Sequence, residues 1–231
     1  MIALLVIAVA SFVLFRLLGG APRLRVRRNH PAQAAATKIQ ELTEYAGRLE
    51  TTKKYTGAEK VYLQILKIDH RHVPTYTRLA ALYTAQQNVT DAIECFQIAT
   101  QLSPSGETFY NLGLAYYNNQ NPMKAVASFE KAIMFEPSVP HYIGLAKAFN
   151  RLHDGDRVVS TLEQAVAFEP SPKVLWLLAD AYTAAGRTEE LPAIYERIKE
   201  LDPRDKRLRT LRAAAKASGR HRPAKLDKTA S

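Results

Sequence analysis

Residues 109–137 read FYNLGLAYYNNQNPMKAVASFEKAIMFEP, and the spacing in and around this stretch indicates a repeat fold. The proline that closes it is one of four that recur every 33 residues, at Pro104, Pro137, Pro170 and Pro203. Two series of apolar residues keep the same spacing of 33 residues. They are Ala92, Ala125, Val158 and Leu191, and Phe96, Phe129, Leu162 and Tyr195. A period of this length is typical of an all-α solenoid of stacked helix pairs. Each proline should end the second helix of its pair, because it lacks an N–H and disfavours helix in the preceding residue.

The quoted stretch resembles the tetratricopeptide repeat closely. In that family a large residue, a Leu-Gly pair and a Tyr mark the first helix, and an Ala, an aromatic residue, a second Ala and a Pro mark the second. The matching residues here are Phe109, Leu112, Gly113, Tyr116, Ala125, Phe129, Ala132 and Pro137. Four further units match more loosely, and the divergent first unit has His70 in place of the proline. The resemblance covers about residues 35–203 and implies five helix-turn-helix repeats.

These units predict the organisation of the chain. The solenoid is expected over residues 35–217, with repeats at about 39–72, 73–105, 106–138, 139–171 and 172–204. Residues 205–217 place Leu208 and Leu211 on one face of a basic segment, which predicts a helix that seals the end of the solenoid. The remaining basic tail, residues 218–231, is expected to be disordered.

The first eighteen residues, MIALLVIAVASFVLFRLL, are apolar apart from Ser11 and Arg16. Residues 1–21 are long enough for a transmembrane helix if Arg16 extends its guanidinium to the membrane surface. A basic linker follows at residues 22–34, and its arginines would keep the repeats in the cytoplasm and contact the membrane. These arginines are Arg23, Arg25, Arg27 and Arg28. The layout predicts a single-pass protein of the bacterial inner membrane.

A cleaved secretory signal is the alternative for this segment, and it would make the protein secreted or periplasmic. Ala8-Val9-Ala10 could serve as the cleavage site, and the uninterrupted apolar run is short for a membrane span. Against cleavage, no basic residue precedes the apolar run, and VLFRLL would be left exposed on the mature protein.

The formal charge of +10 is concentrated at the two ends of the chain. Residues 31–203 carry 17 basic and 20 acidic residues, so the high isoelectric point does not favour a nucleic-acid partner for the repeats. The basic ends leave one alternative function open, which is docking on anionic lipid or nucleic acid.

No pattern in the chain indicates catalysis, a cofactor or a metal site. The six histidines form no HExxH motif, and no nucleophile elbow, Walker sequence or dinucleotide-binding glycine run is present. The single cysteine, Cys95, lies on a predicted helix and fits a half-buried thiol. The chain is therefore not predicted to be an enzyme.

The tetratricopeptide resemblance implies a binding groove instead. In that family, a stripe of the first helices that is not used for packing lines a concave groove that holds peptides. The first two units carry small and polar residues on this stripe, whereas the third to fifth carry aromatic and aliphatic ones edged by polar groups. The predicted groove residues are Tyr110, Leu114, Tyr117, Asn118, Ile143, Lys147, Asn150, Arg151 and Trp176. The predicted function is a membrane-anchored scaffold that binds a partner protein or peptide there.

Overall fold

The computed structural model describes residues 31–219, and it describes side chains as far as residue 213. Within that range the chain forms eleven α-helices, one short 3-10 helix and no strand. The elements are α2 (Pro31–Thr51), α3 (Tyr55–Ile68), α4 (Val73–Ala85), α5 (Val89–Leu102), α6 (Gly106–Asn118), α7 (Pro122–Phe135), α8 (Val139–Arg151), α9 (Gly155–Phe168), α10 (Pro172–Ala184), η1 (Thr188–Glu190), α11 (Leu191–Leu201) and α12 (Lys206–Gly219).

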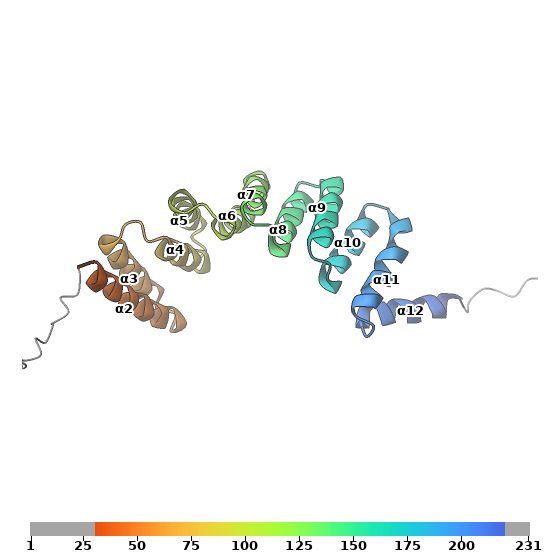
Figure 1. Ribbon diagram of the computed structural model, residues 1–231, viewed down its shortest axis with the longest axis horizontal. Helices are drawn as coiled ribbons and strands as arrows, with labels where there is room; N and C mark the ends of the chain where they lie inside the picture. Colours follow the sequence, from red (N-terminus) through yellow and green to blue (C-terminus); the bar gives the residue numbers. More distant parts are fainter. Residues whose placement is uncertain (1–30, 220–231) are drawn as a thin grey trace, which may run out of the picture.

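The helices pair in sequence order, and the five pairs stack into an arch (Figure 1). The first helix of each pair (α2, α4, α6, α8 and α10) lies on the inner side of the arch, and the second lies on the outer side. The buried side chains form a core that runs along the arch in three clusters. The all-α solenoid predicted from the 33-residue period is therefore confirmed.

The four recurring prolines act as the sequence predicts. Helices α5, α7, α9 and α11 each end two residues before their proline. The residue directly before each proline leaves the helical region, with φ between −138° and −153°. The clash between a proline ring and the residue before it accounts for this sharp stop.

The turn within each pair has one residue in the left-handed conformation. In the fifth pair this residue is Gly186, at φ 74°, as expected for a glycine that ends a helix. The equivalent residues of the other pairs are not glycines, yet their φ angles lie between 56° and 62°: Lys53, Gln87, Gln120 and His153. The same turn geometry thus recurs in all five pairs and gives them a common shape.

Tyrosines at the ends of the inner helices link neighbouring pairs. The hydroxyl of Tyr83 donates to Glu59 at 2.9 Å, and the hydroxyl of Tyr182 donates to Glu163 at 2.8 Å. Burial and the bond to Glu163 raise the pKa of Tyr182 to about 12, so the hydroxyl keeps its proton at neutral pH. These bonds help to fix how one pair stacks on the next.

The tightest packing surrounds Phe129 of α7, whose side chain is fully buried. A Cβ atom added to Gly113 of α6 would lie 2.7 Å from two atoms of this ring, and one added to Gly144 of α8 would lie 2.7 Å from its Cε1. The ring therefore sits against two glycines from neighbouring pairs. This packing accounts for glycine at both positions, because any larger residue would meet the ring.

The ends of the solenoid differ slightly from the sequence-based boundaries. Helix α2 already includes Pro31, the first described residue, which lies inside the predicted linker of residues 22–34. At the other end α12 runs to Gly219, two residues into the tail that was expected to be disordered. Three consecutive alanines, which are strong helix formers, precede this extension.

The predicted membrane anchor, residues 1–21, lies outside the described part of the chain, as does nearly all of the tail. Among the helices of residues 31–219, none combines the length and the apolar character that a membrane span requires.

Candidate binding groove

The inner face of the arch is hollowed between α8 and α10. The hollow has a volume of about 460 Å³. Its apolar wall comes from three helices: Ile143 and Ala146 of α8, Val158 and Leu162 of α9, and Leu177 and Ala181 of α10. Polar groups stand around this wall, and they are Lys147, Asn150, His153 and Asp180. An apolar concave surface with a few polar groups is the usual form of a binding site.

Four of the predicted groove residues meet at this hollow: Tyr117, Ile143, Lys147 and Asn150. The ring of Tyr117 is half-buried, and the guanidinium carbon of Arg151 lies 4.1 Å from its centroid. Arg151 also donates a hydrogen bond to the Tyr117 carbonyl oxygen at 3.2 Å. Arg151 thus contacts Tyr117 at the edge of the groove, although Arg151 does not line the hollow itself.

The other three predicted residues of α6 lie outside the hollow. Tyr110 packs on Phe129, with ring centroids 5.7 Å apart, and on His141, at 5.1 Å. Leu114 is half-buried against the same core cluster. Asn118 is exposed at the last residue of α6. Tyr110 and Leu114 therefore help to hold neighbouring pairs together.

Trp176, predicted as a groove anchor, is already covered by the chain itself. Its ring packs on Tyr195 at a centroid distance of 5.6 Å, and its indole Nε1 donates to Asp205 at 3.1 Å. The guanidinium carbon of Arg207 also lies 4.2 Å from the centroid of the Trp176 ring. The start of α12 thus closes one end of the groove.

Sequence reasoning missed the part of the wall that comes from α9 and α10. Val158 and Leu162 were identified only as members of the two apolar series that recur every 33 residues. Leu177 and Ala181 were not singled out. One signal was present, because Leu177 directly follows the predicted groove residue Trp176 on α10, and Ala181 lies four residues further along. The exposure of Leu177 and Ala181 depends on how far the neighbouring pair of helices tilts away. The 33-residue period does not predict this tilt.

A second hollow, of about 690 Å³, lies between α2 and the loop that leads to α4. Alanines and Ile39 supply most of its apolar wall, and its lining contains no Tyr, Phe, Trp, Lys or Arg. Its lining begins at Ala32, close in sequence to the first described residue. We therefore place the candidate site in the groove between α8 and α10.

Two observations concern the metal-ligating and nucleophilic side chains of the described residues. No group of three or more His, Cys, Asp or Glu side chains in residues 31–213 is arranged to hold a metal ion. Burial raises the pKa of the Cys95 thiol to about 11, with a smaller contribution from Asp91. A thiol of this kind stays protonated near neutral pH and is a poor nucleophile.

Comparison with known proteins supports this architecture. Residues 106–139 match the tetratricopeptide repeat family, and they include the whole stretch from Phe109 to Pro137. The fold is that of a tetratricopeptide-repeat solenoid. A search of curated protein sequences found no relative.

Several solved tetratricopeptide-type structures superpose well on the chain. MamA has a TM-score of 0.62 at 20% identity, with 73% of this chain and 93% of that chain covered. YrrB, described as a tetratricopeptide-repeat protein with an unusual peptide-binding site, has a TM-score of 0.58 at 17% identity, with 80% and 99% covered. The C-terminal part of a repeat-containing protein from Cytophaga hutchinsonii has a TM-score of 0.63 at 20% identity, with 74% and 71% covered. At these identities the likeness establishes the fold. Tetratricopeptide folds generally mediate protein–protein interactions.

Proposed function

We propose that this chain is a membrane-anchored scaffold that captures a segment of a partner protein in the groove between α8 and α10. The hollow on the inner face carries the proposal, because it combines an apolar wall with polar groups that are free to bind. Lys147 and Asn150 are exposed and make no hydrogen bond or ion pair with another described side chain. The peptide-binding site described for YrrB, which has a similar fold, lends support.

The chemistry of the groove favours an extended or helical peptide that presents apolar side chains. Such side chains would cover Ile143 and Leu177, removing apolar surface from water at about 25 cal/mol per Å². The amide of Asn150 can both donate to and accept from a peptide backbone. The ammonium of Lys147 can pair with a carboxylate of the partner. These polar groups would set the direction and register of the bound segment.

Groove substitutions should abolish capture without unfolding the chain. The variant Tyr117→Ala with Lys147→Glu removes an aromatic contact and reverses a charge in the hollow. Loss of a central contact typically weakens binding by about 2 kcal/mol or more, which is roughly thirtyfold. The partner is first captured by the wild-type chain and identified, and its affinity for each variant is then measured by calorimetry.

The matched control is Lys60→Glu, an equal charge change at an exposed position of the outer helix α3. Circular dichroism confirms that helix content is unchanged in both proteins. If the control loses the partner and the groove variant keeps it, the groove proposal is wrong.

The anchoring part of the proposal rests on the sequence of residues 1–28. The apolar run of residues 1–21 followed by arginines supports a membrane span with the repeats in the cytoplasm. Compartment reporters fused after Ser231 should then be active only as cytoplasmic fusions, and the protein should keep its N-terminal methionine. A mature N-terminus at Ser11, or a reporter active only outside the cytoplasm, would overturn this part.

A further inference from the structure

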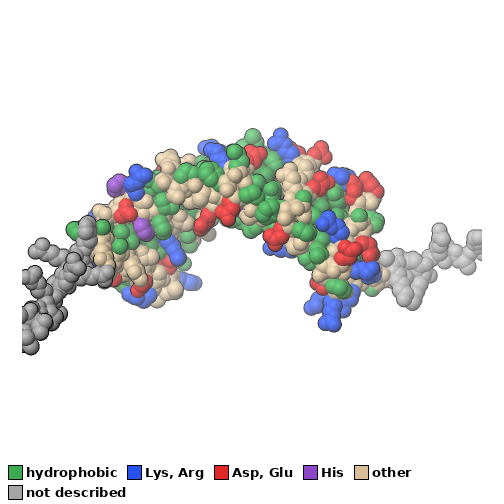
Figure 2. All heavy atoms as spheres, in the orientation of Figure 1, with side chains coloured by type: hydrophobic (Ala, Val, Ile, Leu, Met, Phe, Trp, Pro, Cys, Tyr) green, Lys and Arg blue, Asp and Glu red, His purple; other side chains and the backbone are tan. Residues whose placement is uncertain are grey.

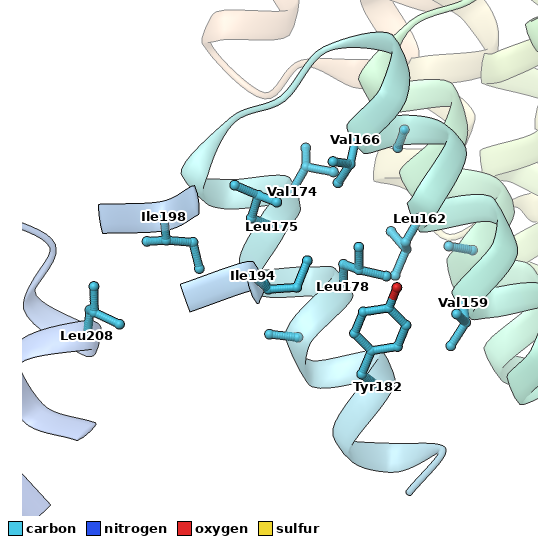
Figure 3. Packing of buried hydrophobic residues seen from close by; sticks show 13 residues of the cluster. Val159, Leu162, Val166, Val174, Leu175, Leu178, Tyr182, Ile194, Ile198 and Leu208 are labelled. Atoms are coloured by element: carbon cyan, nitrogen blue, oxygen red, sulfur yellow. The ribbon is translucent and has the colours of Figure 1, made fainter. Parts of the chain in front are cut away.

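The start of α12 is fixed against α10 by a small network around Trp176. Asp205 caps α12, and its Oδ1 accepts a hydrogen bond from the backbone N–H of Leu208 at 2.7 Å while its Oδ2 accepts from the Trp176 indole at 3.1 Å. Leu208 is almost fully buried in the last core cluster, where it approaches Ile198 (Figure 3). These contacts attach the start of α12 to α10 and to the last core cluster.

Arg207 makes a separate set of contacts, on the groove side of this network. Its guanidinium lies over the Trp176 ring, and two of its nitrogens bond the two carboxylate oxygens of Asp180, one of them at 3.2 Å. Asp180 also lines the hollow described above. A flat aromatic face next to a carboxylate that accepts two parallel bonds is the arrangement that a guanidinium fits best.

The pairing of Trp176 with Asp180 is specific to the fifth pair of helices. The equivalent pairs of residues on the other inner helices are Ile143 and Lys147, Tyr110 and Leu114, Thr77 and Ala81, and Thr43 and Gly47. None of these combines an aromatic ring with a carboxylate. The ion pair between Arg207 and Asp180 is about half exposed on both sides, and exposed pairs contribute little to stability. The arrangement is therefore not explained by sealing the solenoid, which Leu208 already does.

We propose that Trp176 and Asp180 form a binding subsite for an arginine side chain at the end of the groove, filled by Arg207 until a partner presents its own arginine. The inference rests on the proposed groove function and names the chemistry of the bound segment. The partner's guanidinium replaces that of Arg207 on the same ring and carboxylate. Helix α12 stays attached through Leu208 and through the bond between Asp205 and Trp176. Arg207 thus competes with the partner's arginine and lowers its apparent affinity for the subsite.

Arginine rather than lysine is the expected occupant. The two oxygens of Asp180 are bonded by two guanidinium nitrogens at once, which a single ammonium group does not reproduce in this geometry. The planar guanidinium also stacks on the indole face. The surrounding basic residues of α12, visible at that end of the arch in Figure 2, disfavour a cation bound by charge alone.

The fluorescence of Trp176 tests this inference directly, because it is the only tryptophan of the chain. The full chain is kept in detergent micelles and titrated with N-acetyl-arginine amide. In the Arg207→Ala variant the emission should change in a saturable way. The wild-type chain should need at least about tenfold more probe, since a competitor that fills the site nine-tenths of the time weakens apparent affinity by that factor. N-acetyl-lysine amide should act much more weakly on the variant.

Three further proteins control this titration. Arg209→Ala removes another exposed arginine of α12 and should behave as the wild type. Arg207→Ala combined with Asp180→Asn should lose the response to arginine. Arg207→Lys keeps the charge, so the amount of arginine probe that it needs should fall between the amounts needed by the wild type and by Arg207→Ala. This variant also shows whether the response comes from a general loosening of α12.

The inference is overturned if Arg207→Ala shows no saturable response, if arginine and lysine probes act equally, or if Arg209→Ala responds as Arg207→Ala does. These outcomes are independent of partner capture, so they leave the proposed function standing. Conversely, if the groove variant above keeps its partner while the arginine response is observed, the groove proposal fails and the subsite remains.

Discussion

Replacing Gly113 with leucine should lower the stability of the solenoid by about 1–3 kcal/mol or more, because the new side chain would overpack a close helix contact. Even the first added atom, the Cβ, would lie 2.7 Å from the Phe129 ring. The ring cannot move aside freely, since Gly144 of the next pair confines it on another side. Urea denaturation followed by circular dichroism measures the change.

Gly47 provides a matched control for this prediction. It lies in the inner helix α2, and a Cβ atom added there would have no neighbouring atom within 4 Å. Gly47→Ala should therefore raise stability slightly, by about 0.5–1 kcal/mol, because alanine favours helix over glycine. The two substitutions should change the stability of the solenoid in opposite directions. Equal effects at Gly113 and Gly47 would show that the helix contact around Phe129 is described wrongly.

Phe129→Ala should have a still larger effect, at about 3–5 kcal/mol, since a fully buried aromatic side chain is lost and a cavity remains. Phe129 contacts both the third and the fourth helix pairs. Because each pair of a solenoid is stabilised mainly by its neighbours, the unfolding transition should also become broader. Phe135→Ala, which removes an aromatic ring that is 55% exposed at the end of the same helix, should cost much less.

A combined variant separates the contact from general damage to the core. In a Phe129→Leu background the ring atoms that crowd Gly113 are absent, so Gly113→Ala should destabilise the chain less than it does in the wild type. If the two effects are simply additive, the two residues do not share a contact.

Most of the fold could be predicted from the period of 33 residues, because the interactions that produce this period act between residues close together in the sequence. Proline and hydrophobic spacing act within a few residues, so they predict where α5, α7, α9 and α11 end and which faces are buried. Position along a repeat also predicts contacts between the two helices of one pair, as at Gly113 and Phe129. Gly144 could have been noticed only by asking which residue faces the other side of the same ring.

The groove was harder to predict, because periodicity says which stripe faces inward but not what covers it. Trp176 sits on that stripe, yet its partners Asp205 and Arg207 come from a helix 29 and 31 residues further along. Tyr110 likewise sits on the stripe but packs on Phe129 and His141. Tyr117, Ile143, Lys147 and Asn150 are the predicted residues that the structure brings together in the hollow. Whether they bind a partner stays a prediction.

Site-specific photocrosslinking tests the groove proposal most directly. A photoreactive amino acid is placed in turn at Lys147 and Asn150 in the hollow, and at Lys60 and Lys131 on the outer helices α3 and α7. All four side chains are exposed, so the probes differ in position and not in access to solvent. Capture in the groove predicts that the partner crosslinks from Lys147 and Asn150 and not from Lys60 or Lys131. Crosslinks from the outer positions alone would contradict it.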